Sequence, residues 1–131
     1  MRVLIVEPDK ILAKAYVQHF TAAGLNVLVA RDGQTAVHSI DEEMPDALVL
    51  ELQLGAHSGI EFLHELRSYE DWAGIPIIVN SSVPKDAFGV SDAAWQRLGI
   101  SWYFYKPKTS SKQLIGALLA LEAEKWNLNS I

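Results

Sequence analysis

The sequence predicts an α/β protein in which five strands form a doubly wound parallel sheet with helices on both faces. Five short apolar segments alternate with segments whose apolar residues recur at helical spacing. One of the five, residues 47–50 (ALVL), is an unbroken apolar run, which is typical of a parallel strand covered on both faces. The length of 131 residues suits one domain with a substantial core, so residues 1–131 are expected to form a single domain.

The chain opens with two strand–helix units. Residues 2–6 (RVLIV) predict a strand, and Asp9 is the expected N-cap of a helix that ends at Gly24. A second strand is expected over residues 25–30. It leads into a weaker helix, which stops before Pro45 because a residue that precedes proline is disfavoured in the helical conformation.

The middle of the chain holds the strand at residues 47–50 and the acidic residue that follows it, Glu51. The chain then turns at Gly55, and Ser58 with Glu61 has the spacing of a capping box that opens a third helix. We therefore expect Glu51 to lie where a buried strand gives way to a loop and then to a helix. In open α/β sheets, ligands bind at this carboxyl edge.

Two further units complete the pattern. Strands are expected over residues 75–79 and 100–105, and residues 84–98 between them predict a fourth helix that Gly89 weakens. The last helix begins near Ser110, at a second capping box.

Composition excludes several classes of function. The net charge of −5 and the lack of any basic run argue against a nucleic-acid surface, which needs clustered lysine and arginine. The chain has no cysteine, so it has neither disulfides nor a thiolate metal site, as is usual in a reducing cytoplasm. No apolar run is long enough for a signal peptide or a membrane span. We expect a cytoplasmic protein that binds neither nucleic acid nor membrane.

The residues best suited to chemistry follow the predicted strands. They are Glu7 and Asp9 after the first strand, Glu51 after the third, Ser81 after the fourth and Lys106 after the fifth. Right-handed crossovers bring these ends to one edge, where carboxylates suit a divalent cation and the hydroxyl and ammonium suit phosphate oxygens. We expect Lys106 to contact Glu51, with the Ser81 hydroxyl within reach, because a buried carboxylate without a partner is costly.

The chain resembles the receiver domain of two-component response regulators. The resemblance rests on four segments that have the family's order and similar spacing: VLIVEPD, PDALVLELQL, IPIIVNSS and WYFYKP. It implies a flavodoxin-like (βα)5 fold with strand order 2-1-3-4-5. It also implies a role for each residue at the carboxyl edge. Glu51 occupies the position of the phospho-accepting aspartate, and Glu7 and Pro8 occupy the positions of the acidic pair that helps bind magnesium. Ser81 matches the switch hydroxyl, Tyr103 the aromatic switch residue and Lys106 the lysine that contacts the phosphoryl group.

Two departures from the family pattern bear on function. The acceptor position holds Glu51, which is one methylene longer than aspartate, and Pro8 supplies no ligand where the family has its second acidic residue. Asp9, one position later, is directed differently. We therefore expect no cofactor, and weak or absent Mg²⁺ binding through Glu7 and Glu51. The resemblance also implies a cis peptide between Lys106 and Pro107.

These features predict a degenerate receiver, a protein-interaction module that signals without aspartyl phosphorylation and is not an enzyme, with no catalytic residue. The alternative is a working receiver that accepts a phosphoryl group on Glu51 or on a nearby side chain. A flavodoxin-like binder of a nucleotide or flavin is disfavoured, because no Gly-rich loop follows the first strand.

The resemblance also implies a docking surface, formed by helix 84–98, strand 100–105 and the final helix. We expect Trp95, Trp102 and Tyr105 to contribute to it, because aromatic residues are enriched in binding hot spots. The expected partner is a protein, either a histidine kinase or a downstream effector, and a homodimer is a further possibility.

Overall fold

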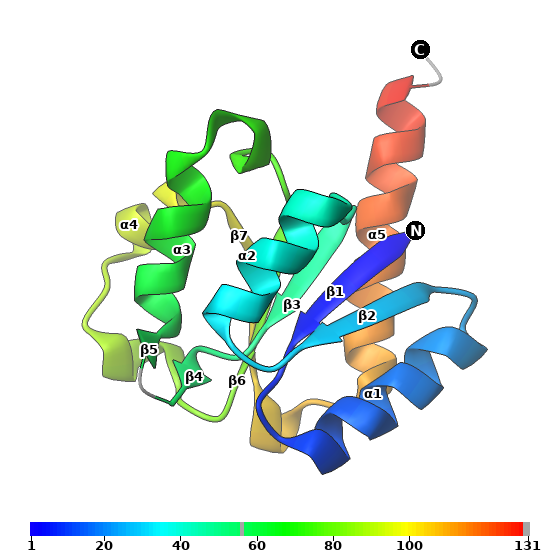
Figure 1. Cartoon of the computed structure of the whole chain (residues 1–131), viewed down its shortest axis with the longest axis horizontal. Helices are drawn as coiled ribbons and strands as arrows, with labels where there is room; N and C mark the ends of the chain where they lie inside the picture. The colour runs from blue at the N-terminus through cyan, green and yellow to red at the C-terminus, as the bar shows by residue number, and fades with distance from the viewer. Residues whose placement is uncertain (56, 130–131) are drawn as a thin grey trace.

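The computed structural model describes residues 1–55 and 57–129. Five parallel strands form the central sheet (Figure 1): β1 (Arg2–Val6), β2 (Asn26–Ala30), β3 (Ala47–Leu50), β6 (Ile77–Ser81) and β7 (Ile100–Tyr105). Their order is β2-β1-β3-β6-β7, which is the predicted order 2-1-3-4-5 when only the strands of this sheet are numbered along the chain. The labels differ because two unpredicted strands, β4 (Gln53–Leu54) and β5 (His57–Ser58), intervene in the chain and pair with each other in a separate antiparallel sheet.

Helices cover both faces of the sheet, as the alternating pattern predicted. In Figure 1, α1 and α5 lie on one face, and α2, α3 and α4 lie on the other. The helices are α1 (Lys10–Ala22), α2 (Gly33–Glu42), α3 (Gly59–Ser68), α4 (Asp92–Arg97) and α5 (Ser111–Asn129), and three short 3-10 helices are η1 (Glu70–Trp72), η2 (Lys85–Phe88) and η3 (Lys106–Lys108).

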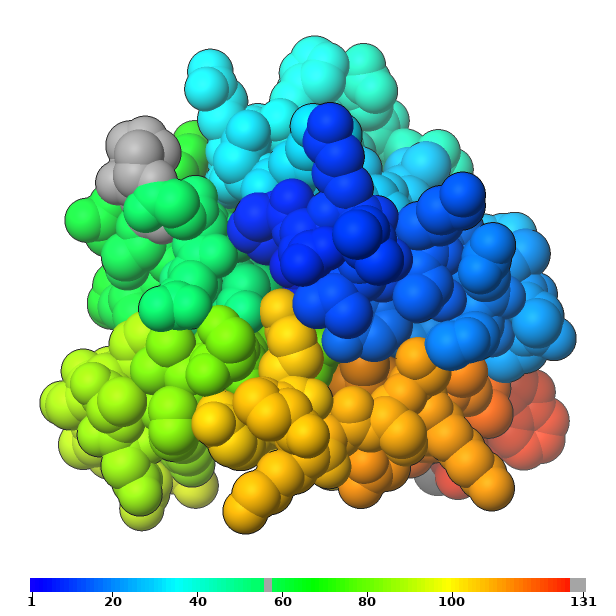
Figure 2. All heavy atoms as spheres, turned by 90° about the horizontal axis from the view of Figure 1, so that it is seen from below, coloured from blue at the N-terminus to red at the C-terminus, as the bar shows by residue number. Residues whose placement is uncertain are grey.

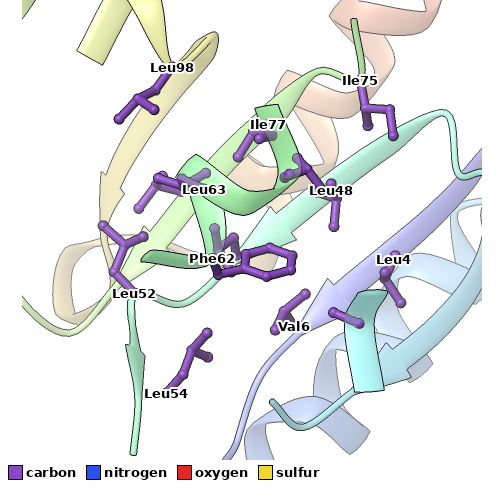
Figure 3. Close-up of a cluster of buried hydrophobic side chains, with 14 of the residues drawn as sticks. Leu4, Val6, Leu48, Leu52, Leu54, Phe62, Leu63, Ile75, Ile77 and Leu98 are labelled. Atoms are coloured by element: carbon purple, nitrogen blue, oxygen red, sulfur yellow. The ribbon is translucent and has the colours of Figure 1, made fainter. Parts of the chain in front are cut away.

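The core consists of two clusters, one on each side of the sheet, because successive side chains of a strand point to opposite faces. Val3 and Ile5 of β1 pack toward α1 and α5, whereas Leu4 and Val6 pack toward α2 and α3. Figure 3 shows the second cluster, in which Phe62 lies among side chains from the strands. The sheet is therefore buried on both faces, which leaves its edges as the places where polar side chains can gather.

The capping signals in the sequence are present as hydrogen bonds. Asp9 Oδ1 accepts from the amides of residues 11 and 12, and Ser58 Oγ accepts from those of residues 60 and 61. Both halves of the box at α5 form, since Gln113 Oε1 accepts from Ser110 N at 2.8 Å and Ser110 Oγ accepts from Gln113 N at 3.2 Å. These caps explain why the predicted helix starts lie within a residue of the observed ones.

The predicted helix over residues 84–98 is wrong in extent. Gly89 adopts a left-handed backbone conformation (φ 65°), which ends η2, and Ser91 caps a separate α4 of six residues. A glycine adopts this conformation without the clash that a Cβ would cause, so the segment breaks where the sequence suggested only a weak point. The expected cis peptide between Lys106 and Pro107 is also wrong. None of the described residues has a cis peptide bond, and Lys106–Lys108 form the 3-10 helix η3.

Candidate functional site

The carboxyl edge of the sheet brings the predicted site residues together. Glu7 directly follows β1, Glu51 follows β3, Ser81 ends β6 and Lys106 follows β7. Figure 2 views the molecule from this edge, where the segment that begins η3 (orange) lies between the β1–α1 connection (blue) and the β3–β5 region (green). Residues up to 99 positions apart therefore meet at one site.

A lysine ammonium bridges two buried carboxylates at the centre of the site. Lys106 Nζ donates to Glu7 Oε1 at 2.6 Å and to Glu51 Oε1 at 2.8 Å. Glu7 and Glu51 are 3% and 4% exposed, so both charges are largely withdrawn from water. The contact that we expected between Lys106 and Glu51 is present, and Glu7 shares the same ammonium.

Backbone amides complete the surroundings of Glu51. Its Oε2 accepts from the amides of Leu52 at 2.7 Å and Gln53 at 3.2 Å, and its Oε1 accepts from the amide of Ser82 at 3.0 Å as well as from Lys106. The extra methylene of glutamate thus lets the carboxylate turn back over its own chain. Each oxygen receives two donors, which uses the hydrogen-bonding capacity of a carboxylate.

These contacts set the ionisation of the pair. Burial alone would raise the pKa of Glu51, but Lys106, the nearby Ser81 hydroxyl and the amides of Ser82 and Gln53 outweigh it and lower the pKa from 4.5 to about 2. For Lys106, burial lowers the pKa, yet the two carboxylates raise it above its ordinary value. Both groups are therefore charged at neutral pH.

The two expected switch residues lie beside this pair. Ser81 is fully buried, and its Oγ accepts from Val83 N at 3.1 Å. Tyr103 donates its hydroxyl to Val83 O at 2.5 Å and packs edge-on against Trp95, with ring centroids 5.5 Å apart. Burial, with the nearby charge of Glu51, raises the pKa of Tyr103. Tyr103 thus ties the segment after β6 to β7.

The donor set does not fit a magnesium site. Pro8 offers no ligating side chain, and the carboxylate of Asp9 is exposed and turned to cap α1; only its backbone amide reaches the site, where it donates to Glu7 Oε2 at 3.1 Å. The prediction that the Asp9 carboxylate joins Glu7 in an acidic pocket is therefore wrong, because the cap of α1 holds this side chain away from Glu7. Between residues 1–55 and 57–129, no group of three or more His, Cys, Asp or Glu side chains could hold a metal ion.

The predicted aromatic interface is wrong for Trp95. Its ring is 3% exposed and lies edge-on between Phe88 and Tyr103, because α4 presses it onto the sheet. Trp102 and Tyr105 of β7 are partly exposed, and Trp102 packs against the core between α1 and α5. Only these two of the three predicted residues reach the surface.

Sequence reasoning missed the part of the site that Ser82 and Gln53 supply. Both donate backbone amides to Glu51, and their side chains join the two loops, since Ser82 Oγ donates to Gln53 Oε1 at 2.7 Å. Every residue except proline has a backbone N–H, so residue type does not reveal which amides donate to the site. The one available signal was position, because both residues lie within a few places of a strand's carboxyl end.

Comparisons with known proteins agree with this geometry. The sequence matches the response regulator receiver domain over residues 3–118. It is 33% identical over 85 residues to the probable transcriptional regulatory protein TcrX of Mycobacterium tuberculosis (65% of this chain, 35% of that protein), and 34% identical over 79 residues to the response regulator MprA of Mycobacterium avium (60% and 34%). The chain thus spans about a third of the length of these relatives.

Solved structures share the fold. A sensor protein from Polaromonas sp. JS666 superposes with a TM-score of 0.82 at 21% identity, covering 92% of this chain and 94% of that one. The receiver domain of the Francisella response regulator 1452 gives 0.81 at 25% identity, with coverage of 95% and 98%. In the part of the chain that the structure describes, no helix has the length and apolar character to cross a membrane. The sheet order, the carboxyl-edge site and the match over residues 3–118 together place this chain in the receiver domain family of two-component response regulators.

Proposed function

We propose that this receiver acts without phosphorylation, as a protein-interaction module whose own Glu51 carboxylate takes the place of a phosphoryl group. One observation carries the proposal: four donors, Lys106 Nζ and the amides of Leu52, Gln53 and Ser82, converge on that carboxylate. Such an array of cation and amide donors suits an anion, and Glu51 supplies one permanently. Through these bonds Glu51 permanently holds two segments next to β3: the one that begins at Ser82 and the one that begins at Lys106.

The same contacts oppose phosphoryl transfer to Glu51. A nucleophilic oxygen needs a free lone pair, whereas both oxygens of Glu51 already accept two hydrogen bonds each. The incoming phosphoryl group would also bring negative charge beside Glu7, and Pro8 leaves no second carboxylate to hold the divalent cation that normally offsets this charge in phosphoryl transfer. We infer that wild-type protein binds Mg²⁺ weakly or not at all.

The proposed output is docking of a protein through the α4–β7–α5 face, with a histidine kinase or a downstream effector as partner or a second copy as a homodimer. Trp102 and Tyr105 are partly exposed there, and Leu119 of α5 is 46% exposed. Tyr103 supports a link between this face and the site, because its hydroxyl holds Val83, two residues after Ser81. The α4–β7–α5 face is thus linked to a site in which the Glu51 carboxylate is the bound anion.

The alternative function is a working receiver that accepts a phosphoryl group on Glu51 or on a nearby side chain. It is favoured by the presence of Lys106 and by the buried Ser81 hydroxyl at the same edge. The two proposals make opposite predictions for one experiment.

The experiment measures intact mass after incubation with acetyl phosphate and Mg²⁺. Wild type should gain no phosphoryl group, and Pro8→Asp should bind Mg²⁺ more tightly than wild type, as judged by calorimetry, because it restores a carboxylate ligand. The double variant Pro8→Asp/Glu51→Asp should then gain one phosphoryl group, with Glu51→Asp alone as the matched control. Ready modification of wild type would establish the alternative instead.

A further inference from the structure

A groove that shares no residue with the Glu51 site lies between α2 and the segment that follows α3. The groove is open to solvent and has a volume of about 780 Å³, within the usual range for ligand pockets. Its walls combine aromatic, apolar and acidic side chains, among them Val37, His38 and Asp41 of α2 and Tyr69, Asp71 and Trp72 at η1. No role that we have assigned to the chain uses these residues.

An aromatic pair forms one wall of the groove. Tyr69 and Trp72 have ring centroids 4.6 Å apart with their planes tilted by 54°, and Tyr69 is 45% exposed. Trp72 also packs against the core, so its position is fixed from behind. Ring surface that is held in place and open to solvent is suited to binding a cationic or planar group.

The carboxylates that line the groove are Asp41 and Asp71. Residues 32–72 hold ten of the sixteen carboxylates and one lysine or arginine, Arg67. Glu43, Asp46 and Glu51 of this range pair with Arg2, Lys125 and Lys106. Arg67 cannot balance the two groove carboxylates, because its guanidinium donates to five backbone carbonyls, those of Leu98, Trp72, Ala73, Ile75 and Gly99. Across the residues that the structure describes, Asp41 and Asp71 of the groove form no ion pair.

From the groove, its aromatic wall and its unbalanced carboxylates, we propose that this site binds an arginine side chain in a basic segment of a partner protein, independently of the Glu51 site. A guanidinium is planar, so it can stack on Tyr69 or Trp72 while its edges donate to Asp41 and Asp71. Charge complementarity selects a basic partner over an acidic one. Both carboxylates are exposed, so the interaction is weak and falls with added salt.

The test uses a tetra-arginine peptide with an acetylated amino terminus and an amidated carboxyl terminus as the probe, titrated into ¹⁵N-labelled protein. The reporter is the indole N–H of Trp72, assigned with Trp72→Phe. We expect a saturable shift of this signal, weakened about two- to fivefold by Asp71→Asn and also weakened by Tyr69→Ala. Asp86→Asn removes the same charge from an exposed position outside the groove and should leave binding unchanged. Tetra-lysine should bind less tightly, because an ammonium does not stack.

Three results would overturn the proposal. The first is a set of shifts spread evenly over the acidic helices without saturation, which would mean diffuse attraction only. The second is an affinity that Tyr69→Ala leaves unchanged although the amide spectrum shows a folded protein. The third is concentration-dependent self-association in ultracentrifugation that the peptide disrupts, since the occupant would then be a second copy of this chain.

Discussion

The replacement Glu51→Gln tests the central ion pair most directly. The change keeps the size of the side chain but removes its charge, and it turns one acceptor oxygen into a donor. Whichever way the amide lies, its –NH2 group faces two of the donors that now hold the carboxylate. We therefore expect Glu51→Gln to lower the free energy of unfolding at pH 7.

The magnitude follows from two estimates. The lowered pKa of Glu51, from 4.5 to about 2, corresponds by linkage to at most about 3 kcal/mol. A hydrogen bond to a charged group contributes about 1.5–3 kcal/mol. Since Lys106 keeps Glu7 as a partner, the expected loss is about 1–3 kcal/mol.

The pH dependence has a defined sign. The pKa of Glu51 is lower in the folded than in the unfolded state, so its charge stabilises the fold fully above about pH 4.5 and progressively less as the pH falls toward 2. The stability difference between wild type and Glu51→Gln should therefore be largest near neutral pH and should shrink below about pH 4.5.

The assay is urea unfolding followed by tryptophan fluorescence, at pH 7 and at steps from pH 5 to pH 3. Asp86→Asn, which removes an exposed carboxylate, serves as the matched control and should change stability by less than about 0.5 kcal/mol. A loss below about 0.5 kcal/mol at pH 7 for Glu51→Gln, or a difference that stays constant down to pH 3, would refute the proposed role of the ion pair.

Three further predictions concern other parts of the fold. Arg67→Lys should cost about 2–4 kcal/mol in urea unfolding, because an ammonium cannot reach the five carbonyls that the guanidinium joins; a loss near zero would show that water replaces those bonds. Gly59→Ala should lower the melting temperature, since its Cβ would lie 2.5 Å from a backbone Cα, whereas Gly116→Ala, with open space around it, should stabilise α5 by about 0.5–1 kcal/mol; equal effects would contradict the packing argument. Trp102→Ala should weaken partner binding or self-association, measured by ultracentrifugation, more than it lowers stability; the reverse order would make Trp102 a core residue only.

Local signals in the sequence determined most of the fold. The strands at residues 2–6, 47–50 and 100–105 were predicted with the observed bounds, because each is an apolar segment bordered by turn or capping residues. The helix starts followed from Asp9, Ser58 and Ser110, since a cap depends on residues within three positions of itself. Strands β4 and β5 were missed, because two residues are too few to show any periodicity.

The sequence also predicted which side chains meet at the site, whereas their interactions became known from the folded structure. Glu7, Glu51 and Lys106 follow strands whose carboxyl ends must meet at one edge, so their convergence was predictable. The shared ammonium and the amides on Glu51 depend on how the loops after β3, β6 and β7 lie against each other. Those positions are set by contacts between residues far apart in the chain, which no local pattern encodes.

The burial of individual side chains also depends on contacts between distant parts of the chain. Trp95 has the residue type of an interface hot spot, and it lies in the core because the break at Gly89 lets α4 press it against β7. The groove beside Tyr69 and Trp72 exists because α2 and η1, which are separate in sequence, lie next to each other over the sheet. Local patterns thus predicted most strands and helix starts and the edge of the sheet where the polar side chains meet. Contacts between distant parts of the chain set which side chains face solvent, because the exposure of a side chain depends on every neighbour that folding brings near.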